Sequence, residues 1–286
     1  MSRLQNSLHS GQEKRQPGRY RYAKCSKMKI ISLGLGIQST AMYLMSSLGQ
    51  IDRADYAIFA DPGAELPDTY ELWNYLNIWQ ERNNGIPLIK KRKSLYADII
   101  KGENSTGQKF VSIPAFGEKH GMIRRQCTRE YKIDVVVKAV RELHGLKKYQ
   151  RMKPTEMWLG ISLDEIQRMK ESLLPNITYH YPLIENRFTR SYCQTFLKEN
   201  GFNNVQKSAC VFCPYHNNSQ WRYIKQNYPK EWKKIIRVDD AIRDSSVKGK
   251  DHQKIFLHRS LKPINDVYLQ EDQEDLFMCE EGYCGI

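Results

Sequence analysis

The sequence of 286 residues lacks any apolar run that approaches the ~20 residues of a membrane-spanning helix. It also lacks the apolar core of a secretory signal peptide. The seven cysteines are odd in number, which together with the missing signal disfavours a disulfide framework. We therefore expect a soluble, cytoplasmic protein without a membrane partner, whose cysteines bind a metal or carry out thiol chemistry.

Acidic residues are scarce at the beginning of the chain. Residues 1–29 hold eight Lys and Arg against one Glu, and so contribute much of the net charge of +13. Their Ser- and Gln-containing, polar composition predicts a disordered basic tail over residues 1–27, with Met28 directly before the first strand. A nucleic-acid-binding arm and a transit peptide are the alternatives to a merely solvated tail.

Short apolar segments and amphipathic segments alternate along the next part of the chain. Strands are expected around residues 30–31, 54–60, 87–91 and 157–161, and helices over residues 41–48, 66–82, 128–143, 164–172 and 189–201. This alternation predicts an α/β fold with an open, mainly parallel sheet and helices on both faces. We expect a main domain over residues 28–225 and a helical C-terminal segment over residues 226–286 with a Cys-rich end.

A glycine-rich turn over residues 32–40 separates the first strand from the first helix. Free backbone N–H groups and the positive end of the helix dipole would face whatever lies in this turn. The turn has neither the lysine of a Walker loop nor the glycine spacing of a dinucleotide fingerprint. Polar turns at Asp61 and Gly160 also follow strands, and the carboxyl ends of parallel strands meet at one edge of a sheet. The sequence thus predicts a site for a phosphorylated or sulfated small molecule at this edge.

Four segments, in the same order, resemble one protein family. Residues 34–40 resemble the pyrophosphate loop, Ser-Gly-Gly-x-Asp-Ser, of N-type ATP pyrophosphatases and phosphoadenylyl-sulfate (PAPS) reductases. Residues 59–70 resemble the reductases' Asp-Thr-Gly and Phe-Pro-Glu-Thr segment, residues 160–168 their Gly-x-Arg-x-x-Glu-Ser-x-x-Arg turn, and residues 181–184 their Pro-Leu segment. The sequence is therefore similar to the PAPS reductase family, within the adenine nucleotide alpha-hydrolase superfamily, over roughly residues 29–215.

The resemblance implies that an adenylyl nucleotide reacts at its α-phosphate. This nucleotide would be ATP, PAPS or adenylyl sulfate (APS). Turn amides together with Ser39 and Thr40 would hold phosphate oxygens, while Asp61 would accept hydrogen bonds from the ribose. The expected nucleotide-binding residues are Ser32, Gly34, Gly36, Gln38, Ser39, Thr40, Asp61, Gly63, Gly160 and Ile161.

Arg168 is a candidate catalytic residue within the third of these segments. By the resemblance it would neutralise charge on the leaving phosphate or sulfate, and the alternative is an ion pair with Asp164 or Glu165. Two positions depart from the family pattern. Gln38 replaces the Asp of the loop, which weakens the case for a metal-assisted pyrophosphatase step. Ser162 replaces an Arg of the reductases, which weakens the case for sulfate recognition.

Cys127 and the pair formed by Cys210 and Cys213 are a candidate metal site. A Cys-x-x-Cys spacing lets two thiolates reach one centre. Residues 125–133 resemble the Cys-Cys-x-x-Arg-Lys-Val segment of APS reductases, although Gln126 replaces one cysteine. In those reductases this segment and a later Cys-x-x-Cys hold a 4Fe-4S cluster, so the resemblance implies such a cluster here.

Three cysteines leave the cluster one ligand short. Cys193, Cys279 or Cys284 would supply the fourth ligand, with Cys193 taken as the first choice. Alternatively the open iron would bind sulfide, as in cluster-dependent tRNA thiolases of the same superfamily. Zinc is the other possible metal, held by the three cysteines and His216.

Cys284 is a candidate nucleophile near the end of the chain. Cys284 and Gly285 resemble the late Glu-Cys-Gly segment of the reductases, although Tyr283 stands where the Glu would be. The resemblance implies that the Cys284 thiolate attacks the sulfate sulfur and that thioredoxin or glutaredoxin resolves the product. Nearby carboxylates would raise the pKa of this thiol, and a spare cysteine in a frayed end is the alternative.

Three functions follow as hypotheses from these residues. The first is a sulfonucleotide reductase with an iron–sulfur cluster. The second is an ATP-dependent sulfurtransferase that thiolates tRNA or DNA. The third is a non-catalytic nucleotide-binding subunit of a nucleic-acid complex, for which Gln38 would mark the loss of catalysis.

Overall fold

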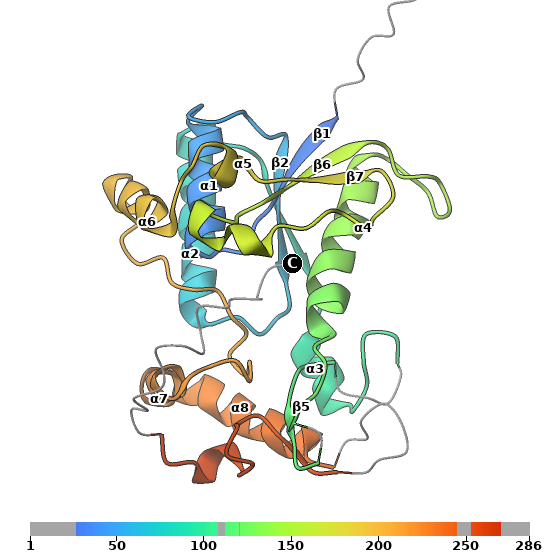
Figure 1. Ribbon diagram of the computed structural model, residues 1–286, viewed down its shortest axis with the longest axis vertical. Helices are drawn as coiled ribbons and strands as arrows, with labels where there is room; N and C mark the ends of the chain where they lie inside the picture. Colours follow the sequence, from blue (N-terminus) through green and yellow to red (C-terminus); the bar gives the residue numbers. More distant parts are fainter. Residues whose placement is uncertain (1–26, 108–111, 120, 245–252, 270–286) are drawn as a thin grey trace, which may run out of the picture.

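A five-stranded parallel sheet forms the centre of the computed structural model, which describes residues 27–107, 112–119, 121–244 and 253–269 (Figure 1). The strands are β1 (Met28–Ser32), β2 (Tyr56–Asp61), β3 (Leu88–Arg92), β6 (Thr155–Leu159) and β7 (Ile177–His180). They lie in the order β3-β2-β1-β6-β7, and every pairing is parallel. The expected α/β fold with a mainly parallel sheet is confirmed.

The order of the strands reverses at β1. The chain runs outward from β1 through β2 to β3, and then returns to place β6 on the other side of β1. In sheets of this kind the loops on either side of such a reversal diverge and leave a crevice at the carboxyl ends of the strands. The glycine-rich turn after β1 therefore lies where a parallel sheet most often binds a ligand.

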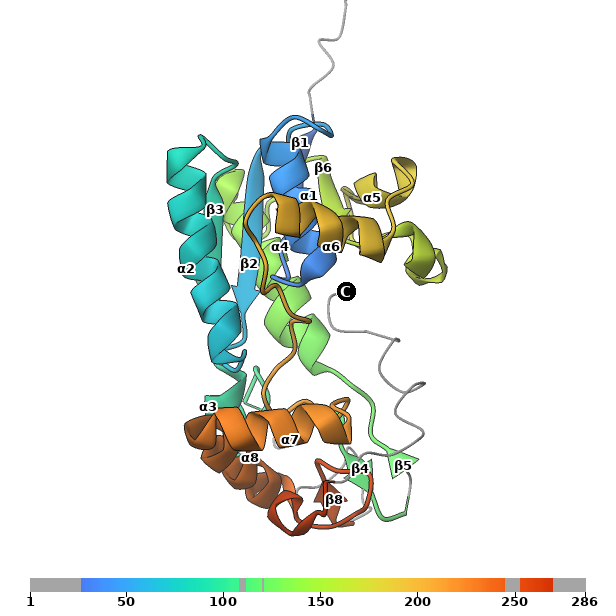
Figure 2. The same ribbon diagram turned by 90° about the vertical axis from the view of Figure 1, so that its left-hand side faces the viewer.

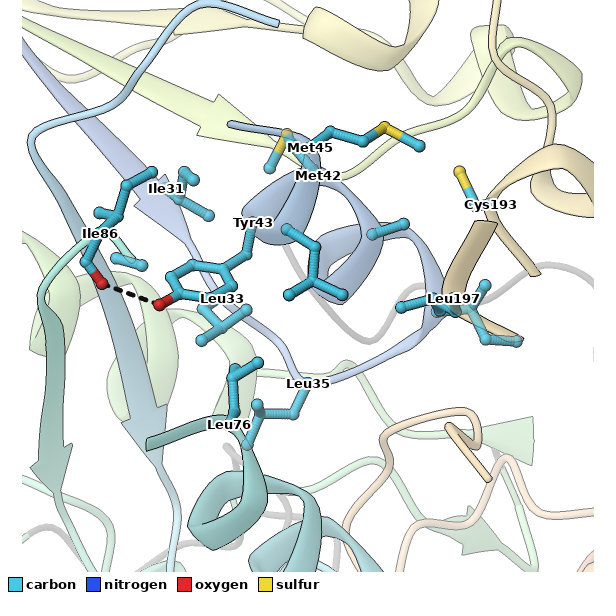
Figure 3. Close-up of a cluster of buried hydrophobic side chains, with 14 of the residues drawn as sticks. Ile31, Leu33, Leu35, Met42, Tyr43, Met45, Leu76, Ile86, Cys193 and Leu197 are labelled. Carbon is cyan, nitrogen blue, oxygen red and sulfur yellow. Dashed lines mark hydrogen bonds between the residues drawn. The ribbon is translucent and has the colours of Figure 1, made fainter. Parts of the chain in front are cut away.

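One face of the sheet is covered by α1 (Ile37–Ser47), α2 (Pro67–Arg82) and α6 (Arg190–Glu199), with the short α5 (Pro182–Glu185) beside α1 (Figure 1). Ile31 and Leu33 of the β1 segment point into this layer, where they meet Met42 and Tyr43 of α1 (Figure 3). The Tyr43 hydroxyl donates a hydrogen bond of 2.8 Å to the carbonyl of Ile86, so its polar atom is satisfied inside an apolar cluster.

The other face is covered by a π-helical turn η1 (Arg129–Ile133) that continues into α4 (Asp134–Leu143). Val136, Ala139 and Val140 of α4 pack on Ile30 and Ile58. Successive strand residues point to opposite faces, so Ile30 and its neighbour Ile31 supply the two separate cores. Both faces of the central strands are buried, which explains why their middle residues are apolar on both sides of the sheet.

A second lobe lies beyond the carboxyl ends of the strands (Figures 1 and 2). It contains α3 (Leu95–Ile100), β4 (Phe116–Gly117), β5 (Gly121–Met122), α7 (Asn218–Asn227), α8 (Pro229–Ile242), β8 (Ile255–Phe256) and η3 (Ile264–Asp266). Its core is separate and includes Trp221 and Trp232. Because this core also takes residues from α3 and the β4 region, the second lobe is assembled from two distant parts of the chain.

Several local expectations can be compared directly with the structure. The helix expected over residues 189–201 is confirmed as α6, and the Thr189 side chain caps it by accepting a hydrogen bond of 3.2 Å from the Tyr192 N–H. The helix expected over residues 164–172 is wrong beyond its first turn. Only the 3-10 turn η2 (Leu163–Arg168) forms, and Met169 has extended backbone angles. No helix in the described ranges is long and apolar enough to cross a bilayer.

The turn after β6 packs closely against the start of α1 at Gly160. A Cβ atom at Gly160 would lie 2.7 Å from the backbone nitrogen of Ser39 and 2.8 Å from its Cα. We expect Gly160→Ala to lower the free energy of unfolding by about 1–3 kcal/mol, as for other overpacked positions. Gly36→Ala is the control, since its Cβ would stay 3.7 Å from the nearest atom, in Ser208. Equal urea denaturation midpoints for the two variants would contradict this packing.

Candidate functional site

The turn after β1 forms an anion cradle at the N-terminus of α1. Gly36 is the N-cap of α1, and its helix start has no side-chain cap and no acidic residue in the first turn. The first backbone N–H groups of the helix therefore keep their capacity to bind an anion. Ser39 braces the turn from within, because its hydroxyl accepts from the Gly34 N–H at 3.2 Å and donates to the Gly36 carbonyl at 3.3 Å.

Leu35 occupies an unusual backbone conformation inside this cradle. Its φ angle is +57°, in the left-handed region that branched side chains rarely adopt. Its side chain is buried in the apolar layer beside Leu76, which holds the strained residue in place (Figure 3). Strain of this kind persists where the surrounding packing enforces it, and it is concentrated at ligand sites.

The two positions that depart from the family pattern contact each other. The Gln38 side-chain amide donates a long hydrogen bond of 3.5 Å to the Ser162 hydroxyl, and both side chains are buried. This pair joins the turn after β1 to the turn after β6. A neutral amide and a neutral hydroxyl therefore occupy the positions where the family pattern has two charged residues.

Two buried oxygen atoms of this region have no hydrogen-bond partner among the described residues. They are Oγ1 of Thr40, in the first turn of α1, and Oδ2 of Asp61, at the end of β2. The other oxygen of Asp61 accepts from the Gly63 N–H at 2.7 Å and from the Tyr70 hydroxyl at 2.9 Å. Because burying an unsatisfied polar atom is costly, the Thr40 hydroxyl is suited to donate to a ligand oxygen and the Asp61 oxygen to accept from a ligand donor.

Asp61 lies in a positively charged setting. Nζ of Lys90 is 3.8 Å and Nε of Arg92 is 3.9 Å from Oδ2, distances that give charge attraction without a hydrogen bond. Burial, and next the Asp61 carboxylate, raise the pKa of Tyr70 above its usual range, so that the hydroxyl remains a donor. The predicted ribose-binding carboxylate is thus held in one orientation with one oxygen unused.

The remaining predicted nucleotide-binding residues fall at the same edge of the sheet. Ser32 ends β1, and Gly160 and Ile161 follow β6. The Ile161 side chain is buried in the core below α4, so only its backbone is placed to meet a ligand. The structure brings the three predicted turns together.

Arg168 is paired with an acidic residue of its own turn. Its guanidinium forms an ion pair of 2.5 Å with the Glu165 carboxylate, and both side chains are largely buried. This is the local alternative considered for Arg168. Charge neutralisation of a leaving group by Arg168 would first require this pair to break.

Cys127, Cys210 and Cys213 line one small cavity close to the edge of the sheet at which the three turns lie, which is called the nucleotide edge below. Its walls also include Arg125 and Lys132. The other lining residues are Pro62, Leu95, Ile113, Pro114, Thr128, Tyr131 and Phe212. The structure therefore brings three of the four predicted metal ligands together, with two cationic side chains beside them. Cations stabilise thiolates, the form in which cysteines bind metal.

Cys193 is not at this cavity, which corrects its prediction as the fourth ligand. It lies on α6, where Cys193, Phe196 and Leu197 form the face that packs on α1 (Figure 3). Residues three and four positions apart share a helix face, so Cys193 lies in the same apolar layer as Phe196 and Leu197. Burial raises the pKa of the Cys193 thiol to about 12, which keeps it protonated.

His216, the histidine of the zinc alternative, lies against protein partners in this arrangement. Its Nε2 is 2.9 Å from the Cys210 carbonyl and its Nδ1 is 3.4 Å from Gln220 Oε1. Both ring nitrogens thus face protein partners, and the ring packs edge-on against Trp221. Over the described residues, no three His, Cys, Asp or Glu side chains converge as ligands of one metal ion.

Cys279 and Cys284 lie outside the described residues. The hypothesis of a Cys284 nucleophile therefore stays a prediction. So does the alternative in which one of these cysteines completes the cluster.

Sequence reasoning missed Glu65, Lys132 and Ser208, which connect the two parts of the site. Glu65 lies inside the segment 59–70, but nothing in its pattern indicates that the side chain is buried. Lys132 lies in the π-helical turn η1, a local irregularity that is frequent at functional sites. A signal for their contacts is absent from the sequence because the partners are far apart along the chain.

No protein-family model matches the sequence, and no curated protein matches it. The function is therefore inferred from the site itself and from the motifs described above.

Burial of His216 should make the stability of the folded protein depend on pH. Burial lowers its pKa to about 4, whereas an unfolded histidine titrates near 6.5, so the unfolded chain binds the proton more readily. The stability that His216 contributes is complete above about pH 6.5 and is lost as the pH falls towards 4. At pH 5 this loss is about 2 kcal/mol.

The measurement compares metal-free wild type with His216→Gln by urea denaturation at pH 7.5 and pH 5. We expect the wild type to lose more stability than the variant at the lower pH. All other titrating groups are common to both proteins, so the difference isolates His216. An equal loss in both proteins would show that His216 is not buried in its neutral form.

Proposed function

We propose that the chain is an enzyme of sulfur chemistry that acts on an adenylyl nucleotide and holds a 4Fe-4S cluster beside it. The observation that carries this proposal is the adjacency of the two parts of the site. Pro62 lines the cysteine cavity, and it directly follows Asp61, whose unused oxygen belongs to the nucleotide edge. Four motifs that resemble PAPS reductases support adenylyl nucleotides as the ligand class.

Each part of the site has its own role in this proposal. The N–H groups at the start of α1 would bind phosphate oxygens, with Thr40 Oγ1 beside them. Asp61 Oδ2 would accept a hydrogen bond from the ribose. Cys127, Cys210 and Cys213 would hold the cluster, with Arg125 and Lys132 balancing the charge of the thiolates. When bound, the cluster would supply electrons or an open iron for sulfide.

The replacement of an Arg of the reductases by Ser162 favours a second candidate function, an ATP-dependent sulfurtransferase that modifies tRNA or DNA. Ser162 is a buried neutral residue that accepts a hydrogen bond from Gln38, so this position supplies no charge for sulfate. Binding of an α-phosphate by backbone N–H groups does not depend on this position.

Turnover by anaerobically purified protein separates these functions. Sulfite release from PAPS or APS in the presence of thioredoxin or glutaredoxin would support the reductase. Cleavage of ATP to AMP and pyrophosphate, stimulated by tRNA or DNA, would support the sulfurtransferase. Nucleotide binding without either reaction would support the accessory subunit, and the absence of nucleotide binding would refute all three.

Thr40 provides a sharp prediction for the phosphate site. Thr40→Val removes the unpartnered buried hydroxyl while keeping the shape of the side chain, so the stability of the ligand-free protein should stay the same or rise. If the hydroxyl serves a phosphate oxygen, the Kd for ATP should rise by about tenfold, the value of one hydrogen bond to a charged group.

Equilibrium dialysis with radiolabelled ATP measures this change. Thr178→Val is the matched control, because Thr178 is an exposed residue of the edge strand β7. The control should bind ATP as the wild type does. Unchanged binding by Thr40→Val would show that Thr40 plays no part in holding the nucleotide.

A further inference from the structure

Glu65 is a buried carboxylate between the phosphate loop and the cysteine cavity. Its side chain has no exposed surface. Oε2 accepts a hydrogen bond of 3.1 Å from the Ser208 hydroxyl, and Oε1 accepts one of 3.3 Å from Nζ of Lys132. A buried charge is tolerated only when it is paired and hydrogen-bonded, so this arrangement fixes all three side chains relative to one another.

One side of Glu65 leads to the phosphate loop. Ser208 lies directly against Gly36, the N-cap of α1, because a Cβ atom at Gly36 would be 3.7 Å from the Ser208 nitrogen. Any shift of the loop on binding an anion would therefore be felt by Ser208 and by the hydrogen bond it donates to Glu65.

The other side of Glu65 leads to the cysteines. Lys132 lines the cavity together with Cys210. The backbone of Glu65 also forms an isolated antiparallel bridge with Cys210, and the Val211 N–H donates to the Ala64 carbonyl at 2.7 Å. Side-chain and backbone contacts of one residue thus reach both the backbone at Cys210 and the cation that lines the cysteine cavity.

We propose that Glu65 is a positioning residue that couples occupation of the phosphate loop to the geometry of the cysteine cavity. This inference rests on the proposed nucleotide site and adds how that site communicates with the cysteines. Coupling between two sites is reciprocal and requires an element that contacts both. Among the described residues, Glu65 meets that requirement through two hydrogen bonds and one backbone bridge.

The test measures two quantities on metal-free, full-length protein at one pH. The first is the Kd for ATP from equilibrium dialysis. The second is the alkylation rate of Cys127, Cys210 and Cys213 by iodoacetamide, with and without saturating ATP, followed by peptide mass spectrometry. For the wild type we expect ATP to change the rate of at least one of these cysteines by about fivefold or more.

Two variants interrupt the connection at different points. Glu65→Gln keeps the shape of the side chain and removes its charge, while Ser208→Ala removes only the hydroxyl that contacts Glu65. Both should bind ATP within about threefold of the wild type, and in both the effect of ATP on alkylation should fall below about twofold. Ser208→Ala decides the question if Glu65→Gln does not fold, because it leaves the ion pair with Lys132 intact.

Glu142→Gln is the matched control, because Glu142 is a partly exposed acid that pairs with Lys91 on the surface of α4. It should retain the full effect of ATP. If Glu65 has a purely structural role, Glu65→Gln will change the alkylation rates by the same factor with and without ATP. That result would overturn the coupling. Wild-type protein that binds ATP without any change in alkylation would also overturn the coupling, and would leave the nucleotide site standing. A wild type that does not bind ATP would refute the proposed function and the coupling together.

Discussion

The close approach of the turn after β6 to the first turn of α1 is the constraint on which the site depends. Gly160 allows this approach, since any side chain would strike the backbone of Ser39. The reversal of strand order at β1 brings the two turns to one edge, and the Gln38–Ser162 contact joins them. With these turns fixed, the helix start of α1 and Asp61 lie at the same edge of the sheet.

Much of the fold and part of the site could be predicted from local patterns. Four of the five strands of the central sheet and the first two helices follow from hydrophobic periodicity, whereas β7 was not predicted. Parallel strands place the turns at residues 32–40, Asp61 and Gly160 on one edge. Cys210 and Cys213 are brought together by their spacing in sequence, and the helix that Thr189 caps follows from its amphipathic pattern. Each of these features depends on neighbours within about one helical turn or one strand.

The rest of the site depends on contacts between distant residues. Ser208 and Glu65 are separated by 143 positions, and Gln38 and Ser162 by 124, so no periodicity can indicate either pairing. Cys193 was assigned to the metal by its residue type, although its spacing with Phe196 and Leu197 places it on the apolar face of α6. The second lobe likewise requires that α3 and α8 meet, which only the folded chain shows.

The central claim is that one edge of the sheet binds an adenylyl nucleotide beside a cluster held by three cysteines. Its most direct test is a crystal structure of anaerobically purified protein soaked with a non-hydrolysable ATP analogue, with anomalous diffraction recorded at the iron edge. The account predicts phosphate density at the N-terminus of α1, ribose density at Asp61, and iron peaks bounded by Cys127, Cys210 and Cys213. Nucleotide density elsewhere, or a single zinc peak among the cysteines, would contradict it.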